Sequence, residues 1–404
     1  MVTTLIYLIA AGMVLSTGSV YQYIYGRDVF PVLTILLMTG FIFYESIFKN
    51  KKSKITLSAL IGLSFVSMVP FFIDFINYVK SFQIIFFHIT IITLTFMLGI
   101  KNREKIFSAY LNVIVFISLI SALYFFSNIF LDITTIFNPF IQMGYQIYPL
   151  WTKLDMHSSI FIRNQSIFFE PGIFVVHITI ALLLALKKNK HIYSLILSFI
   201  AITTFSTTGF VMIGLYLLFQ FLYKKHRVLK FRYIFAFLLL IYVAFNKVNI
   251  IGQNWNFINQ ASNVIINKFI QGSSSYMSFA GRYMFFSDAS QMFIDSYFLG
   301  RGHYASDYLP QIRTVTSSSL AGLIGELGLF GIFCIFLYTR FFKAFKIFSI
   351  PITLIWLNGE FMAYSILLLF ILAHQSDLFF NNILYRKNKS LAQLPKQIKW
   401  APNG

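Results

Sequence analysis

Long apolar segments alternate with short polar ones along most of the chain. A helix needs about 20 apolar residues to cross a bilayer, and many of the segments reach that length. The pattern predicts an all-α, polytopic membrane protein, with a single integral membrane domain over residues 1–404. The uninterrupted segments predict spans at residues 3–22, 29–48, 55–73, 82–100, 106–130, 170–186, 231–246 and 317–339.

One longer apolar stretch, residues 192–223, has lysine-rich segments on both sides and a polar hinge at 203–209. Lysine-rich segments are expected on the cytoplasmic side of a membrane. A stretch with both ends on that side has to cross twice. We therefore divide it into helices at 192–206 and 208–223.

The last apolar stretch, residues 347–385, contains polar breaks at 358–360 and at 374–377. Neither break leaves two full-length spans, while the basic tail favours an even number of crossings. Together with the segments above, the chain is predicted to form 11–12 transmembrane helices.

Composition supports a membrane protein. Hydrophobic residues make up 58% of the chain and charged residues 11%, whereas soluble domains carry about 25% charged residues. The net charge is +19, but the basic runs are short and lie at predicted membrane edges. Anionic lipid headgroups, not nucleic acid, are their expected partners. A single cysteine, Cys334, excludes a disulfide within the chain.

The basic residues also predict an orientation, because positive loops stay on the cytoplasmic side. The N-terminus is then cytoplasmic, and two long loops, residues 131–169 and 247–316, face outward. The second is predicted to be partly helical, from apolar residues at helical spacing. The five basic runs lie within residues 49–54, 101–105, 187–190, 224–232 and 340–346.

The two outer loops contain Arg163, Arg282, Arg301 and Arg313. A guanidinium group offers a planar fork of donors that suits phosphate and carboxylate, so these arginines form a candidate anion site. The alternative is that such an arginine only anchors the chain at the interface. His303 lies in the turn that contains Arg301.

Glu170 directly precedes Pro171 and an apolar segment. Proline is favoured at the first position of a helix, which places Glu170 at the outer N-terminus of the helix predicted at 170–186. Its carboxylate is either a reacting group or a helix cap. Glu326 lies inside a predicted span, where Gly325 and Gly328 favour close helix packing. His177 is expected to be an interior histidine with satisfied hydrogen bonds.

Four motifs carry a family resemblance. They are Arg163-x6-Glu170-Pro171 before an apolar helix, the hinge at 204–209, the stretch from Gly281-Arg282 to Gly300-Arg301-Gly302, and residues 316–331. In this order the motifs resemble Wzy-type polymerases of O-antigen and capsule, in the O-antigen polymerase/ligase superfamily. Ligases of this superfamily carry an arginine in the hinge and a histidine after the long loop. Here residues 206–208 and 317–319 hold only serine and threonine, which favours a polymerase.

The resemblance implies a GT-C-like glycosyltransferase that joins oligosaccharides carried on undecaprenyl diphosphate. Its place would be the outer face of a bacterial plasma membrane. It implies that Arg163 and Arg282 bind the diphosphate leaving group, assisted by Arg301 and Arg313. Glu170 is the first candidate for the general base and His303 the second.

No metal and no other cofactor are expected. The expected partners are lipid-linked oligosaccharides, membrane lipids and a chain-length regulator protein. Three other functions stay open: an O-antigen ligase, a flippase for lipid-linked oligosaccharides, and a non-catalytic assembly component.

Overall fold

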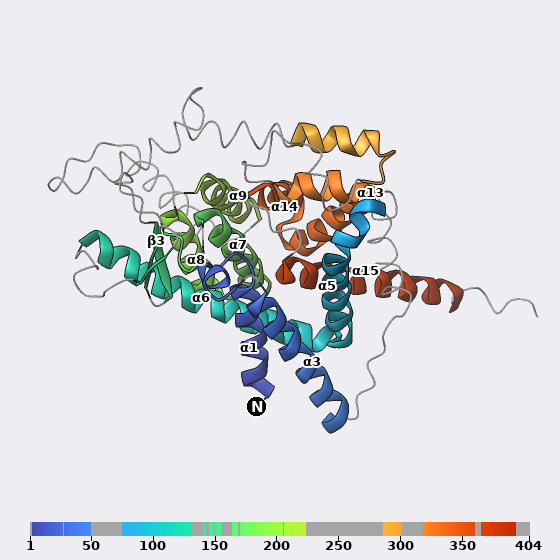
Figure 1. The fold of residues 1–404 in the computed structure, drawn as a ribbon, viewed down its shortest axis with the longest axis horizontal. Coiled ribbons are helices and arrows are strands. Elements are labelled where there is room, and N and C mark those ends of the chain that lie inside the picture. The colour runs from blue at the N-terminus through green and yellow to red at the C-terminus, as the bar shows by residue number, and fades with distance from the viewer. Residues whose placement is uncertain are drawn as a thin grey trace, which may run out of the picture.

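The structure is a computed structural model whose described part is mostly helical (Figure 1). Helices and strands follow the chain order α1 (Val2–Leu15), α2 (Val20–Ile24), α3 (Val29–Lys49), α5 (Phe75–Met97), α6 (Gly99–Phe130), β1 (Phe140–Gln142), β2 (Tyr145–Tyr148), β3 (Trp151–Leu154), α7 (Pro171–Lys187), α8 (His191–Thr203), α9 (Thr207–Tyr223), α13 (Ser319–Phe341), the 3-10 helix η5 (Phe342–Phe348), α14 (Ser349–Gly359) and α15 (Ile366–Ala392). The structure describes residues 2–26, 28–49, 75–130, 140–142, 145–148, 150–154, 164–168, 170–204, 206–223, 286–300, 318–359 and 365–392.

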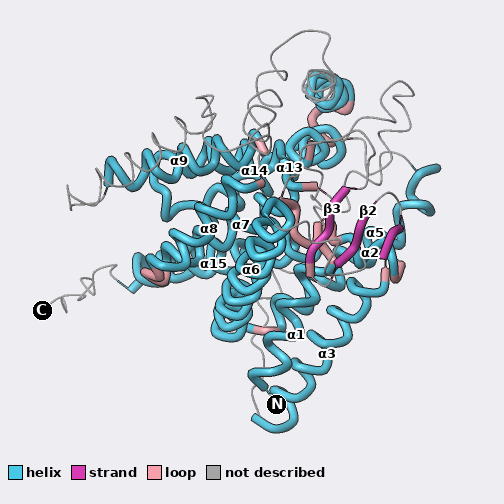
Figure 2. Tube along the Cα trace, turned by 90° about the vertical axis from the view of Figure 1, so that its left-hand side faces the viewer, coloured by secondary structure: helices cyan, strands magenta, loops and turns pink. Residues whose placement is uncertain are grey.

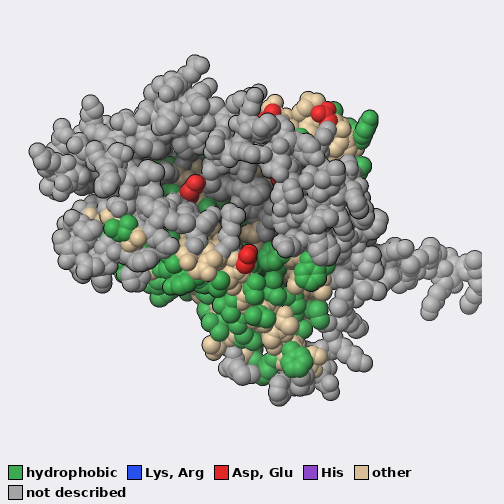
Figure 3. All heavy atoms as spheres, in the orientation of Figure 1, with side chains coloured by type: hydrophobic (Ala, Val, Ile, Leu, Met, Phe, Trp, Pro, Cys, Tyr) green, Lys and Arg blue, Asp and Glu red, His purple; other side chains and the backbone are tan. Residues whose placement is uncertain are grey.

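The chain is an all-α membrane protein, as predicted. Among the described residues, three apolar stretches of helix are long enough to cross a bilayer, at Val29–Ser46, Gly99–Asn128 and Ser319–Asn358. Shorter apolar helices accompany them, and in Figure 3 apolar side chains gather on the surface where Figure 1 shows α1 and α3. The predicted spans at 55–73 and 231–246 lie outside the described residues, so the total of 11–12 helices stays a prediction.

The predicted boundaries around the hinge are confirmed. α7 begins at Pro171, with Glu170 at its N-cap position. α8 ends at Thr203 and α9 begins at Thr207, so the stretch between the two lysine-rich segments is divided at the polar hinge.

The prediction of one uninterrupted span at 3–22 is wrong. α1 ends at Leu15 and α2 begins at Val20, with Gly18 between them at a φ of 71°. Thr17 donates its hydroxyl to Met13 O, and Ser19 accepts from Gln22 N to cap α2. These small hydroxyl side chains satisfy backbone groups that the break would otherwise leave without partners.

The prediction of a break at 374–377 is also wrong, because α15 runs unbroken through these residues. Two of their polar side chains, His374 and Asp377, pair with another helix. Arg103 of α6 forms an ion pair with Asp377, and His374 Nε2 lies 3.3 Å from Glu104 Oε1. Polar residues inside an apolar helix are tolerated when a neighbouring helix supplies partners, so they do not end it.

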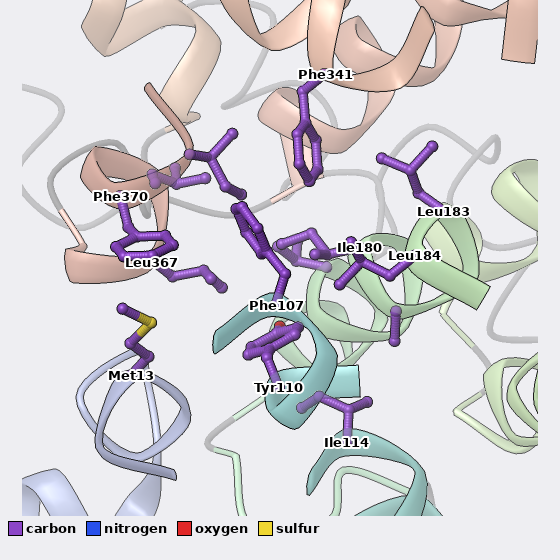
Figure 4. Close-up of a cluster of buried hydrophobic side chains, with 14 of the residues drawn as sticks. Met13, Phe107, Tyr110, Ile114, Ile180, Leu183, Leu184, Phe341, Leu367 and Phe370 are labelled. Atoms are coloured by element: carbon purple, nitrogen blue, oxygen red, sulfur yellow. The ribbon is translucent and has the colours of Figure 1, made fainter. Parts of the chain in front are cut away.

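One core joins the helices. The ring of Phe107, on α6, lies 5.7 Å from Phe341 of α13 and 5.1 Å from Phe370 of α15, measured between ring centroids. Figure 4 shows this ring between those helices, with Leu184 of α7 on a further side. Van der Waals packing of this kind supplies much of the association between helices in a membrane.

Three of the predicted basic runs lie at the same end of the bundle, which we call the basic end. Lys188 Nζ donates to Ser108 Oγ at 2.7 Å, near the start of α6. Lys187 Nζ lies 4.7 Å from the ring centre of Phe341, at the end of α13. The runs at 101–105, 187–190 and 340–346 are thereby brought together, the arrangement that the predicted orientation requires.

Candidate functional site at the broken-helix end

Residues 164–168 connect to the start of α7 without forming a helix, and every side chain among them is buried. The backbone at Ser166 has a φ of 55°, a left-handed conformation that serine rarely adopts. Buried backbone groups outside helices and sheets need other hydrogen-bond partners. The contacts of this segment therefore show what fixes its path.

Asn164 is the centre of the segment. Its side-chain oxygen accepts from the Ser121 hydroxyl of α6, and its Nδ2 donates to Thr203 Oγ1 of α8 at 2.9 Å. The Asn164 backbone N–H donates to the Thr203 carbonyl at 3.2 Å. One fully buried amide thus joins the segment to α6 and to the last turn before the hinge.

Strand β3 holds the other side of the segment. Thr152 donates to Ser166 O from its backbone N at 2.7 Å and from its hydroxyl at 2.8 Å. Gln165 Nε2 donates to Thr152 Oγ1 at 3.1 Å. The strand belongs to the antiparallel sheet β1-β2-β3, drawn in magenta in Figure 2, which the sequence analysis did not predict.

The break between α1 and α2 meets the same segment. Val20 N donates to Ile167 O at 2.8 Å, and Ser19 pairs with Phe168 as an antiparallel bridge. Breaks in three parts of the chain, at 16–19, 164–168 and 203–206, therefore come together. We call this region the broken-helix end. On α6 it includes Ser121, which lies 13 positions beyond Ser108 of the basic end. The two residues are therefore separated by about 20 Å along the helix axis.

His177 lies next to this region and is the interior histidine that the sequence predicts. Its Nδ1 lies 2.7 Å from the Tyr110 hydroxyl and its Nε2 lies 3.3 Å from Thr17 O. Its ring stacks on Phe168 with 4.5 Å between centroids. Both ring nitrogens have partners, so the hydrogen bonds of this histidine are all used in holding the segment in place.

Two helix N-termini open at the broken-helix end, those of α7 and α9. They touch each other: a Cβ added at Gly209, in the first turn of α9, would lie 3.1 Å from Val175 Cγ2 of α7. The N-terminus of a helix carries partial positive charge and free N–H groups. The pair of termini favours a bound anion on this side of the bundle.

Glu170 is half-buried at the N-cap position of α7, with extended backbone, and its side chain makes no capping hydrogen bond. Its role as a side-chain cap, one of the two alternatives drawn from the sequence, is therefore not observed.

The described part of the long loop predicted at 247–316, residues 286–300, packs on α13. A helix at 286–295 places Ala289 against Gly325, where an added Cβ would lie 3.1 Å from Ala289 Cα. Leu329 N donates to Phe298 O at 2.8 Å, beside Gly328, whose φ is 57°. The close packing predicted from Gly325 and Gly328 is confirmed, and it attaches the loop to a membrane helix.

Five of the predicted site residues fall outside the described residues: Arg163, Arg282, Arg301, His303 and Arg313. Two of them directly follow or precede described anchors in the chain, since Arg163 adjoins Asn164 and Arg301 adjoins Gly300. Within the described ranges, no group of three or more His, Cys, Asp or Glu side chains is placed to hold a metal ion.

Residues that the sequence analysis did not single out do most of the positioning: Ser121, Thr152 and Asn164. The polar run Asn-Gln-Ser after Arg163, inside an otherwise apolar region, is the signal that could have pointed to Asn164.

No protein-family model, no curated protein and no solved structure matches the chain. The likeness to Wzy-type polymerases therefore depends on the motifs alone, and the functional argument on the geometry described above.

Proposed function

We propose that the protein is a polysaccharide polymerase that joins oligosaccharide units carried on undecaprenyl diphosphate. The observation that carries the proposal is the buried segment 164–168, hydrogen-bonded to α6, α8 and β3. It fixes the backbone immediately after Arg163 and as far as Phe168, two positions before Glu170. A reaction that expels a diphosphate needs cations and a base held in defined positions.

In the proposed reaction, a sugar hydroxyl of the acceptor unit attacks the anomeric carbon of the donor glycan. A new glycosidic bond forms as the bond between that carbon and the diphosphate oxygen breaks. Arg163 and Arg282 stabilise the negative charge that develops on the diphosphate, with Arg301 and Arg313 beside them. Glu170 accepts the hydroxyl proton, and His303 is the second candidate for this role.

The N-termini of α7 and α9 support this assignment, because they favour an anion at the same end of the bundle. A further point is that Glu170 has no capping hydrogen bond to give up before it acts as a base.

The proposed location is a bacterial plasma membrane, with the N-terminus in the cytoplasm and the long loops outside. The product is O-antigen of lipopolysaccharide or capsule, and a chain-length regulator is the proposed protein partner. Transfer to a lipid A core, as by an O-antigen ligase, is the alternative for the same chemistry.

A second candidate, a flippase for lipid-linked oligosaccharides, is favoured by one observation. The breaks at 16–19 and 203–206 lie inside apolar stretches, and transporters build their binding sites from discontinuous helices. The gene's deletion separates the two functions. Loss of a polymerase leaves single repeat units at the cell surface, whereas loss of a flippase leaves lipid-linked units in the cytoplasmic leaflet.

The arginine roles are tested by Arg163→Lys and Arg282→Lys in the complemented deletion strain. Lysine keeps the charge but loses the planar fork, so each variant should insert normally and give shorter or no glycan ladders. Wild-type ladders from both variants would show that neither guanidinium fork takes part in the reaction.

A further inference from the structure

Three aromatic rings form a cluster at the broken-helix end. Tyr124 of α6 stacks on Trp151 of β3, with 5.9 Å between centroids and 2° between planes. Tyr148 of β2 lies 5.4 Å from Trp151 and 6.1 Å from Tyr124. Tyr148 and Trp151 are fully buried, whereas Tyr124 is half-buried. Tyr124 is thus the most exposed ring of the cluster.

Contacts outside the three rings hold the cluster in place. Tyr148 and Trp151 face each other across the tight turn between β2 and β3, where Leu150 has a φ of 61°. The Tyr21 hydroxyl of α2 accepts from Leu150 N at 3.1 Å and donates to Tyr148 O at 3.3 Å. The rings are therefore preorganised by contacts that do not involve the rings themselves.

Polar atoms with no partner gather around these rings. The indole N–H of Trp151, both amide atoms of Asn128 and the Ser166 hydroxyl are buried without a hydrogen-bond partner among the described residues. Asn128 lies one turn beyond Tyr124 on α6, so the two side chains are neighbours on one face. Ser166 is bonded through its carbonyl to Thr152, the residue after Trp151.

Leaving a buried donor or acceptor without a partner costs free energy, and such groups in a folded protein call for an explanation. A ligand with several hydroxyl groups would satisfy them. Flat aromatic rings with a few fixed polar groups are also a usual composition of ligand sites. A sugar combines an apolar ring face with hydroxyls at its edge, and so matches both features.

We propose that Tyr124, Tyr148, Trp151 and Asn128 form a sugar-binding subsite beside the segment 164–168. A sugar ring of the lipid-linked oligosaccharide packs against Tyr124, and its hydroxyls bond to the Trp151 indole N–H and to the Asn128 amide. The inference rests on the proposed function for the identity of the glycan. It adds the residues that recognise the sugar, as distinct from the arginines that hold the diphosphate.

Two substitutions remove the polar atoms: Asn128→Leu, which keeps the approximate shape of the side chain, and Trp151→Phe, which keeps an aromatic ring but loses part of its volume. Each has a matched control elsewhere in the bundle. Trp356 of α14 is a buried tryptophan whose N–H does have a partner, Val176 O at 3.3 Å. Gln220 of α9 is a buried amide without a partner, like Asn128, and it lies outside the broken-helix end.

The probes are oligosaccharide released from the host's own polysaccharide and, separately, undecaprenyl diphosphate. Binding of each to purified protein is measured by calorimetry. We expect Trp151→Phe and Asn128→Leu to weaken oligosaccharide binding about tenfold or more, since each removes a hydrogen bond to ligand. Binding of undecaprenyl diphosphate should stay at the wild-type value.

The controls should behave differently. Trp356→Phe should lower thermal stability and Gln220→Leu should leave it unchanged or raise it, and both should bind oligosaccharide as the wild type does. Trp151→Phe should lower thermal stability as Trp356→Phe does, because each removes buried ring volume, so oligosaccharide binding is the measurement that separates these two variants.

The subsite is overturned if wild-type protein binds no oligosaccharide, or if both site variants bind it as tightly as wild type. The proposed function fails separately. If the complemented strain makes no longer glycan than the deletion strain, while the site variants still lose oligosaccharide binding, then the polymerase is wrong and the subsite stands.

Discussion

The buried ion pair between Arg103 of α6 and Asp377 of α15 provides a direct test of how the bundle is held together. The Arg103 side chain is 0% exposed and that of Asp377 11%. Besides Arg103, Asp377 bonds through Oδ1 to Asn381 Nδ2 at 2.7 Å. The perturbation is Asp377→Ala, which leaves the guanidinium buried without its counter-charge.

Removing one partner of a buried ion pair costs about 3–5 kcal/mol. The value should lie in this range here because Arg103 has only one other described acceptor, Ala373 O at 3.5 Å, and its Nε has none. Asp377→Asn keeps an oxygen acceptor and should cost less. The double variant Arg103→Met with Asp377→Leu replaces the pair by apolar side chains and should recover most of the loss.

The single cysteine supplies the assay. Cys334 is buried at 1% exposure on α13, so a thiol-reactive fluorophore reports unfolding of the purified protein during heating. Asp377→Ala should lower the midpoint on the order of 5 °C. Glu104→Gln is the matched control: the Glu104 side chain is 55% exposed and pairs with His374, and exposed pairs contribute about 0–1 kcal/mol.

Equal midpoints for Asp377→Ala and Glu104→Gln would refute the reasoning. So would a double variant that is no more stable than Asp377→Ala, because the loss would then not come from an uncompensated charge.

Four further substitutions and one treatment test other parts of the account. Gly328→Ala should destabilise the protein by about 2 kcal/mol or more, since the new Cβ meets Phe298 O at a positive φ. Gly214→Ala has open space around it and should stabilise the protein by about 0.5–1 kcal/mol. The thermal unfolding midpoints of the two variants are compared. Asn164→Leu should abolish glycan ladders while the protein still inserts, and intact ladders would show that the segment needs no such anchor. Glu170→Gln should cut the polymerisation rate of the purified protein by about 100-fold or more if it removes the general base. A wild-type rate would show that another group is the general base. Incubation with EDTA should leave polymerisation unchanged, and activity restored by added metal would contradict a metal-independent reaction.

The sequence predicted the helices at 29–48, 170–186, 208–223 and 317–339 to within two residues, because apolar length and helix-start chemistry are local properties. The helices predicted at 82–100 and 106–130 begin earlier, at Phe75 and Gly99. Pro171 placed the start of α7, and the run of threonines and serines placed the hinge between α8 and α9. The break at Gly18 was missed although its small residues were visible, because an apolar stretch of full length was read as one span. An interruption of α15 was predicted where there is none. Its polar residues are paired with α6, and the sequence does not reveal that pairing.

The candidate site was predictable only in part. The motif from Arg163 to Glu170 drew attention to a segment that the structure shows to be buried and hydrogen-bonded, but the contacts that fix it come from Ser121, Thr152 and Thr203, which are distant in the chain. Such contacts depend on how the helices pack. The hairpin of β2 and β3 was missed because a short strand pair in a long polar loop gives a weak signal.

The central claim is that Arg163 and Arg282 meet over one diphosphate site. It is tested by Arg163→Cys combined with Arg282→Cys, in a Cys334→Ser background, treated with a short bifunctional maleimide in intact membranes. We predict a cross-link between the two positions, identified by mass spectrometry and slowed by undecaprenyl diphosphate, and none in a control pair of Arg163→Cys with Lys343→Cys. Efficient labelling of both cysteines without any cross-link between positions 163 and 282 would contradict the account.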